Sequence, residues 1–224
     1  MKSLCCLDLG LVDYLDALAR QETLVKQRCS GEGHDSLLLL EHLPVFTLGR
    51  GADERNILVP RQTPVYRVSR GGEVTFHGPG QLVGYPIVHL DACGRDVHAY
   101  LRLLESVVID VLAELGVQAV RKPGLTGVWV DNQKIASIGV GVRRWVAYHG
   151  FALNVDPDLS YFADIIPCGL NGVRMTSIAT CLGYAVDMDT VKIRTAERFA
   201  RRFGYEEILW RKNCPTQHSA LSTQ

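Results

Sequence analysis

The chain has 224 residues, of which 47% are hydrophobic and 21% charged, and these globular values exclude a disordered or fibrous protein. Its 24 basic and 24 acidic side chains cancel, so no general attraction to nucleic acid or to an anionic membrane is expected. Apolar runs such as 37–40 are too short to cross a bilayer, and no secretory signal is visible. The seven scattered cysteines favour a reducing, cytoplasmic location over a disulfide framework.

Apolar periodicity predicts the elements of the first half of the chain. Residues 11–28 are expected to form a helix because leucines recur near one face. The clearest helix is 97–115, which Asp96 can cap and Gly116 can close. β-rich runs predict strands around Cys5–Cys6 and at 37–41, 45–48, 64–68 and 82–88.

The second half continues with strands and ends with helices. Residues 127–130 predict a strand, and 131–133 a turn. Apolar residues alternate along 134–142 and 145–155, and Arg143-Arg144 between them predicts an antiparallel hairpin. Two helices are expected after that, at 177–182 with Gly183 as its stop and at 190–203 with Asp189 as its N-cap.

The order of these elements indicates the fold class. The strands come in runs rather than as strict β-α-β units, which favours an α/β (α+β) domain with a mixed sheet and flanking helices. No internal repeat and no linker divides the chain, so a single domain is expected over 1–210. The polar residues 211–224 are predicted to form a flexible tail.

Residues 70–81 form the densest anomaly, Arg-Gly-Gly-Glu-Val-Thr-Phe-His-Gly-Pro-Gly-Gln. Glycine permits positive φ and close approach of the backbone to a ligand, so this segment is a candidate binding site. It is not a phosphate loop, because no Gly-Lys-Ser/Thr follows. A β-hairpin with a Gly-Pro-Gly turn explains the pattern equally well at this stage.

Three further positions are candidates for chemistry. Cys168 lies between Pro167 and Gly169 ahead of a short helix, and a loop thiol near free backbone N–H groups suits a nucleophile with an oxyanion site. A buried structural cysteine is the ordinary alternative. Lys134 opens one strand and His149 precedes another, where a solvated lysine and a core histidine are the ordinary interpretations.

Other site classes have little support in the sequence. There is no Cys-x-x-Cys, no His-Glu-x-x-His and no Gly-x-Ser-x-Gly, so neither a metal site nor a serine nucleophile is indicated. Between residues 50 and 70 the sequence contains five arginines and only two acidic residues, Asp53 and Glu54. Such a run is usually a solvated face, but it can also dock an acidic partner. The five arginines are Arg50, Arg55, Arg61, Arg67 and Arg70.

Taken together, these segments resemble the lipoyl(octanoyl) transferases, the octanoyltransferase family of lipoate biosynthesis and protein lipoylation. The order and spacing of the matching blocks agree over roughly residues 5–205. The blocks are Arg-Gly-Gly-Glu-Val-Thr-Phe-His-Gly-Pro-Gly-Gln-Leu-Val-Gly-Tyr-Pro at 70–86, Thr-Gly-Val-Trp at 126–129, Lys-Ile-Ala-Ser-Ile-Gly-Val at 134–140, His-Gly-Phe-Ala-Leu-Asn-Val at 149–155, Pro-Cys-Gly at 167–169 and Thr-Ser-Ile at 176–178.

The resemblance implies the fold of biotin and lipoate protein ligases. It implies an acyltransferase that moves octanoyl from octanoyl-acyl carrier protein to a lysine of lipoyl domains, those of 2-oxoacid dehydrogenases and the glycine cleavage H protein. It implies a thioester nucleophile at Cys168, its partner at Lys134, and no cofactor. The substrate-binding residues that it implies are Arg70, Gly71, Gly72, Glu73, Val74, Thr75, Phe76, His77, Ser137, Ile138, Gly139, Gly150, Phe151 and Ala152.

The residue types suit this chemistry. A cysteine relay divides acyl transfer into thioester exchange and aminolysis. A nearby ammonium favours the Cys168 thiolate, and the neutral amine of Lys134 can then accept a proton from the incoming lysine. The backbone N–H groups of Cys168 and Gly169 are candidate oxyanion donors.

Three alternatives remain open at this stage. An ATP-dependent lipoate or biotin ligase has the same fold but needs no cysteine, which the Pro-Cys-Gly context disfavours. A non-catalytic acyl-carrier or lipoyl-domain binder would not need Lys134 and Cys168 together. A papain-like thiol hydrolase would use His77 or His149 as its base.

Overall fold

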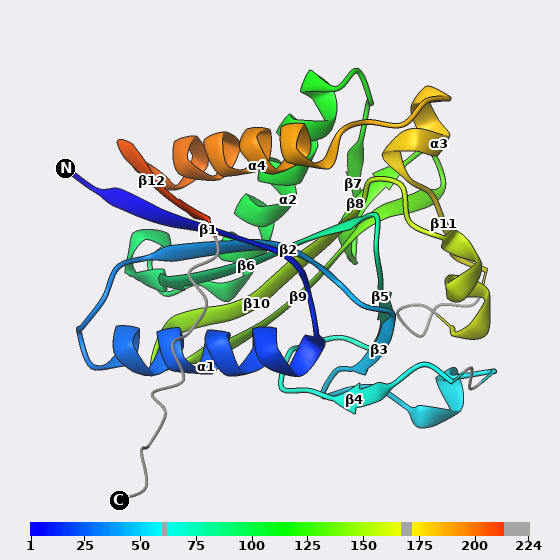
Figure 1. The fold of residues 1–224 in the computed structure, drawn as a ribbon, viewed down its shortest axis with the longest axis horizontal. Coiled ribbons are helices and arrows are strands. Elements are labelled where there is room, and N and C mark those ends of the chain that lie inside the picture. The colour runs from blue at the N-terminus through cyan, green and yellow to red at the C-terminus, as the bar shows by residue number, and fades with distance from the viewer. Residues whose placement is uncertain (60–61, 167–171, 213–224) are drawn as a thin grey trace, which may run out of the picture.

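The computed structural model describes residues 1–59, 62–166 and 172–212, which form a large sheet, a small sheet and covering helices (Figure 1). The large sheet has nine strands in the order β12-β1-β2-β6-β10-β9-β8-β7, and β11 pairs with β9. β12, β1 and β2 run parallel, whereas the strands from β2 to β7 alternate in direction, which confirms the predicted mixed sheet. The strands are β1 Ser3–Val12, β2 Ser36–His42, β6 Gln81–His89, β7 Val120–Lys122, β8 Leu125–Val130, β9 Gln133–Arg143, β10 Val146–Asn154, β11 Arg174–Met175 and β12 Glu207–Lys212.

The helices cover both faces of the large sheet. α2 (Val97–Glu114) and α4 (Met188–Phe203) lie on one face, and α1 (Tyr14–Cys29) lies on the other (Figure 1). Leu37 and Leu39 of β2 therefore pack into the core beneath α2 and α4, while Leu38 and Leu40 pack into the core beneath α1. Burial on both faces explains why β2 is a continuous apolar run. No helix in the described part of the chain is long and apolar enough to span a bilayer.

The smaller sheet holds three strands, β4 (Val65–Arg67), β3 (Val45–Leu48) and β5 (Val74–His77), in the order β4-β3-β5. It has its own apolar cluster, in which Phe46 and Phe76 pack with Phe162 of the 3-10 helix η3 (Leu159–Asp164). The two other 3-10 helices are η1 (Glu54–Asn56) and η2 (Leu90–Cys93).

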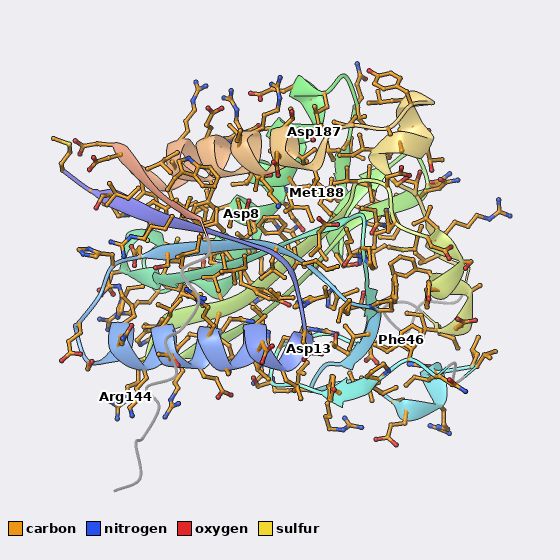
Figure 2. The ribbon with its side chains drawn as sticks, in the orientation of Figure 1. Asp8, Asp13, Phe46, Arg144, Asp187 and Met188 are labelled. Carbon is orange, nitrogen blue, oxygen red and sulfur yellow. The ribbon has the colours of Figure 1, made fainter. Side chains whose placement is uncertain are left out.

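Side-chain caps set where most of the helices begin. The Asp96 carboxylate accepts from the N–H groups of His98 and Ala99, which confirms the predicted cap of α2. Asp13 caps α1, so this helix begins at Tyr14 and not at residue 11, which belongs to β1. Asp187, labelled at the start of α4 in Figure 2, caps this helix in place of the predicted Asp189. Its carboxylate accepts from both the N–H and the hydroxyl of Thr190. The short helix α3 (Ile178–Leu182) ends at Gly183 as predicted.

The alternative interpretation of the Gly-Pro-Gly segment as the turn of a β-hairpin is wrong. β5 pairs with β3 in the small sheet, whereas β6 pairs with β2 and β10 in the large one. Gly80 sits between them with φ at +80°, and its N–H donates to a carboxylate oxygen of Glu41 at 2.7 Å. The segment therefore carries the chain from one sheet to the other.

The sequence pattern also missed three short strands, β7, β11 and β12. β12 lies parallel to β1, and its last residue, Lys212, pairs with Asp8. Arg211 and Lys212 thus belong to the sheet and not to the expected tail, because a partner strand 200 residues away in the chain satisfies their backbone. The remainder of that tail, 213–224, lies outside the described residues.

Candidate functional site

A cavity of about 250 Å³ lies where the segment after Ser69 passes over β9 and β10. Most residues implied by the sequence line it, from three separate segments: Arg70, Gly72, Glu73, Val74, Thr75, His77, Lys134, Ser137, Ile138, Gly139, Gly150, Phe151 and Ala152. The lining also contains residues outside that set: Tyr14, Tyr85, Gly124, Leu125, Thr126, Trp129 and His149. Thr126, Trp129 and His149 fall within the motif blocks quoted above, so a sequence signal for them existed. Tyr85 also lies in the block at 70–86, whereas Tyr14 had no such signal and reaches the cavity because the fold brings α1 there.

Two of the implied residues do not line the cavity. The N–H of Gly71 donates to Val140 O at 2.9 Å, which fastens the glycine-rich segment to β9. The ring of Phe76 points into the small-sheet cluster, where it stacks on Tyr161 with centroids 4.3 Å apart. Both residues hold the cavity wall in place without facing the space inside it.

Glycine at position 139 is required by the close approach of the two segments. A Cβ atom there would lie 2.9 Å from Gly71 O and 3.1 Å from Cδ of Arg70. Since the first contact is with backbone, a side chain would push the wall away from β9. The glycine therefore lets the arginine lie directly against the strand.

Lys134 is only 3% exposed and lies at one end of the cavity. Its amine is 5.5 Å from the centroid of the Trp129 ring, a distance suited to attraction between a cation and an aromatic face. Its chain passes over Gly127, where a Cβ atom would come within 2.5 Å of Cε and 3.1 Å of Nζ. Gly127 has φ of +128°, so both its backbone conformation and the close approach favour glycine.

Glu105, which the sequence analysis did not single out, holds the backbone of Gly127 beneath Lys134. Its carboxylate is fully buried and accepts from the Gly127 N–H at 3.1 Å. Arg102 and Arg121 lie 2.6 Å and 2.9 Å from the same carboxylate, so its charge is paired. A buried carboxylate with these partners fixes the backbone on which Lys134 rests.

A buried hydrogen-bond chain begins at Arg70. The Arg70 guanidinium donates to the carbonyl and the hydroxyl of Thr47, each at 2.8 Å. The Thr47 hydroxyl lies 3.5 Å from Nε2 of His77, whose Nδ1 faces the Gln81 carbonyl oxygen at 2.8 Å. Because that oxygen only accepts, the proton of neutral His77 is on Nδ1.

The chain continues to the residues beside Lys134. Gln81 donates to Asn154 at 2.9 Å, and Asn154 donates to Thr176 O at 2.9 Å. The Thr176 N–H in turn donates to Lys134 O at 3.0 Å, and Met175 pairs with Lys134 across β11 and β9. The glycine-rich segment and the residues that follow 167–171 are thus tied into one network.

Cys168, the implied nucleophile, lies outside the described residues. The described residues nearest to it in the sequence are Ile166 and Gly172. Before it, the Ile166 N–H donates to Asn56 O at 2.8 Å, and Ile165 bridges to Ile57. After it, Met175 lies beside Lys134. The chain that follows the cysteine therefore returns to the strand that carries the lysine.

Three buried histidines, His42, His77 and His149, lie near one another. Burial is the main cause that lowers the pKa of His42 to about 4 and that of His149 to about 3, with the Arg70 charge adding to the effect at His149. Burial, followed by the neighbouring His42, holds the pKa of His77 well below its usual range. All three imidazoles are neutral near pH 7. No group of three or more potential metal ligands occurs among residues 1–59, 62–166 and 172–212.

The arginine-rich run at 50–70 does not form one basic patch. Arg55 pairs with its neighbour Asp53, and Arg67 lies 2.8 Å from Glu54. Arg70 faces inward at the cavity and is 8% exposed. Three of the five arginines are thus placed in surface pairs or in the interior, whereas Arg50 is exposed and Arg61 lies outside the described residues.

Known proteins with similar sequences include several octanoyltransferases. An octanoyltransferase of Citrifermentans bemidjiense is 54% identical over 192 residues, which cover 86% of this chain and 93% of that protein. An octanoyltransferase of Gloeobacter violaceus is 52% identical, covering 88% and 89% of the two chains.

The fold has solved counterparts at low sequence identity. A putative lipoate protein ligase of T. acidophilum superposes with a TM-score of 0.71 at 16% identity, covering 97% of this chain and 90% of that one. Biotin protein ligase from Aquifex aeolicus, in complex with biotin and ATP, gives 0.56 at 14% identity over 91% and 71% of the chains. The family model of the lipoyl protein ligase A/B catalytic domain matches residues 13–200, and with relatives more than half identical over most of their length, the chain belongs to this family, among its octanoyltransferases.

Proposed function

We propose that the chain is an octanoyltransferase of protein lipoylation that works through a thioester on Cys168. The observation that carries this proposal is the single cavity that gathers Lys134 with residues of 70–77, 137–139 and 150–152. The donor is octanoyl-acyl carrier protein. The acceptors are lysines of lipoyl domains, those of 2-oxoacid dehydrogenases and the glycine cleavage H protein, in the cytoplasm.

The first step is a thioester exchange. The Cys168 thiolate attacks the octanoyl carbonyl, the bond to the carrier's sulfur breaks, and the carrier leaves as a thiol after taking up a proton from the Lys134 ammonium, which leaves that amine neutral. The positive charge of Lys134 favours the attacking thiolate. Bonds of the same kind form and break, so the exchange is nearly balanced in free energy.

The second step forms an amide. The ε-amine of the acceptor lysine attacks the Cys168 thioester, and the carbon–sulfur bond breaks. Lys134, once neutral, accepts the proton that the attacking nitrogen loses and passes it to the departing thiolate. Amide formation from a thioester is favourable in free energy, so the overall transfer proceeds without hydrolysis of ATP.

The cavity supplies the binding energy. Burying the seven carbons beyond the carbonyl stabilises the complex by about 0.8 kcal/mol each, roughly 5 to 6 kcal/mol before ordering costs. Ile138, Phe151 and Ala152 offer apolar surface for this purpose. The walls also keep water from the thioester until the amine arrives.

Trapping the intermediate tests the proposal. Incubation with octanoyl-acyl carrier protein and no acceptor is expected to add one octanoyl group to the intact mass, located on Cys168 by peptide mapping. Cys168→Ser should give no such thioester and no turnover. If Cys168→Ser transferred octanoyl at the wild-type rate, the proposed Cys168 thioester intermediate would be refuted. If transfer started from free octanoate and required ATP and Mg²⁺, the chain would instead be a ligase.

A further inference from the structure

The strand at the edge of the large sheet, β7, reaches the aromatic ring beside Lys134. β8 lies between β7 and β9, and its Trp129 pairs with Val120 of β7 and with Lys134 of β9. The amine of Lys122, the last residue of β7, lies 4.7 Å from the centroid of the Trp129 ring. Since the Lys134 amine lies 5.5 Å from the same centroid, the indole contacts one lysine from each neighbouring strand.

No hydrogen bond fixes the orientation of the Trp129 ring. The residue is 2% exposed and lines the cavity, and its Nε1 has no hydrogen-bond partner among the described residues. A buried indole N–H usually finds such a partner. The orientation of this ring therefore depends on packing and on the two lysines.

Lys122 is anchored to the turn that precedes Lys134. Its Nζ donates to Oδ1 of Asn132 at 2.9 Å. Asn132 lies between β8 and β9, two residues before Lys134. Lys122 thus contacts both the ring beside the Lys134 amine and the turn from which the strand of Lys134 begins.

We propose that Lys122 is a positioning residue for Lys134 and acts through the Trp129 ring. This inference deepens the proposed function and rests on it, because it concerns the amine that both transfer steps use. The Lys122 ammonium attracts the face of the indole and, tied to Asn132, keeps the ring beside Lys134. Without that ammonium the ring can turn, and the Lys134 amine loses the surface that fixes its position.

Lys122→Met tests this role, because methionine has a side chain of similar length without the charge. Initial rates are measured with octanoyl-acyl carrier protein as donor and a lipoyl domain as acceptor. We expect kcat to fall about two- to fivefold, the factor that one partly exposed contact between a cation and a ring provides, while KM for the donor does not rise. Lys122→Arg should restore most of kcat, since a guanidinium also stacks on aromatic faces and can donate to Asn132.

A double variant shows whether the effect passes through the ring. Phenylalanine attracts cations less than tryptophan does, so Lys122→Met should lower kcat by a smaller factor in the Trp129→Phe protein than in the wild type. An equal factor in both proteins would mean that Lys122 acts independently of Trp129 and would overturn the inference.

Lys2→Met is the matched control. The Lys2 amine also lies over a ring, 4.2 Å from the centroid of Tyr205, and also donates a hydrogen bond, to Phe203 O at 3.1 Å. None of these three described residues lines the cavity, so kcat of Lys2→Met should equal that of the wild type.

Three results would overturn the inference. They are an equal fall of kcat in Lys2→Met, a wild-type kcat in Lys122→Met, and a change in Lys122→Met that is confined to a higher KM for the donor, which would make Lys122 a docking contact. A wild-type protein that transfers no octanoyl would instead refute the proposed function.

Discussion

The two ends of the cavity hold different chemistry at similar burial. At one end the Lys134 amine lies near the face of Trp129, with the Glu105 carboxylate behind Gly127. At the other end neutral His149 lies near Tyr85, with ring centroids 6.1 Å apart. The Lys134 end thus places an amine beside an aromatic face, whereas at the other end His149 is neutral near pH 7.

The difference follows from what each end provides to a buried ion. A buried cation is tolerated where an aromatic face or a carboxylate stabilises it. At the histidine end the nearest charged group is Arg70, which is itself positive and disfavours protonation of His149. Under the proposed function proton transfer therefore falls to Lys134, because His149 stays neutral near pH 7.

Removing the amine should have the largest effect. Lys134→Ala is expected to lose on the order of 10²-fold or more in turnover and to slow alkylation of Cys168 by iodoacetamide near pH 7, because both depend on the amine. Lys134→Arg should keep the fast alkylation but lose the turnover, since a guanidinium does not release its proton near neutral pH. An alkylation pH profile that is unchanged in Lys134→Ala would show that the amine is remote from the thiol.

Displacing the amine without removing it should have a smaller effect. The new Cβ in Gly127→Ala would meet Cε of Lys134 at 2.5 Å and Ala136 O at 2.7 Å, so the lysine must shift. We expect turnover to fall by roughly 10- to 100-fold, the range that misplacement of a reacting group causes.

Gly116→Ala controls for backbone strain in that experiment. Gly116 also has positive φ, at +84°, but a Cβ there meets nothing within 4 Å. Both variants should lose stability in thermal unfolding, yet only Gly127→Ala should lose octanoyl transfer. Equal losses of activity in the two variants would contradict the role given to Gly127.

The buried, neutral His42 should make the free energy of unfolding depend on pH. His42 has a folded-state pKa of about 4, below its ordinary value of 6.5, so the unfolded chain binds the proton more tightly. The free energy of unfolding should therefore fall as pH drops below 6.5 and keep falling towards pH 4. Between pH 7 and pH 5 His42 alone should account for about 2 kcal/mol of that loss.

Urea unfolding at pH 7 and pH 5 measures this loss. His42→Gln replaces the titrating ring with an amide that does not titrate, so its stability should depend less on pH by about that amount. The comparison uses the difference between the two pH values for each protein, which separates titration from lost packing. An identical pH dependence in variant and wild type would mean that His42 is not held neutral.

Much of the site could be predicted from the sequence. The helix after Asp96 and the pair of strands on either side of Arg143-Arg144 follow from local periodicity and turn residues. The motif blocks named Lys134 and most of the cavity lining, because those residues lie in short segments with an unusual glycine content. Such features can be read from short stretches of sequence, because they do not depend on which segments contact one another in the fold.

The tertiary structure alone decided which side chains close the cavity. Tyr14, which no motif block contains, reaches it because α1 lies across the face of the sheet in which β6 pairs with β2 and β10. The same pairing sends β5 and β6 to different sheets and turns Phe76 away from the ligand space. Strand pairing between distant segments depends on the whole set of partners, and no local pattern encodes it. The sequence by itself thus determined the residue types near the chemistry, and the fold determined the shape of the space around them.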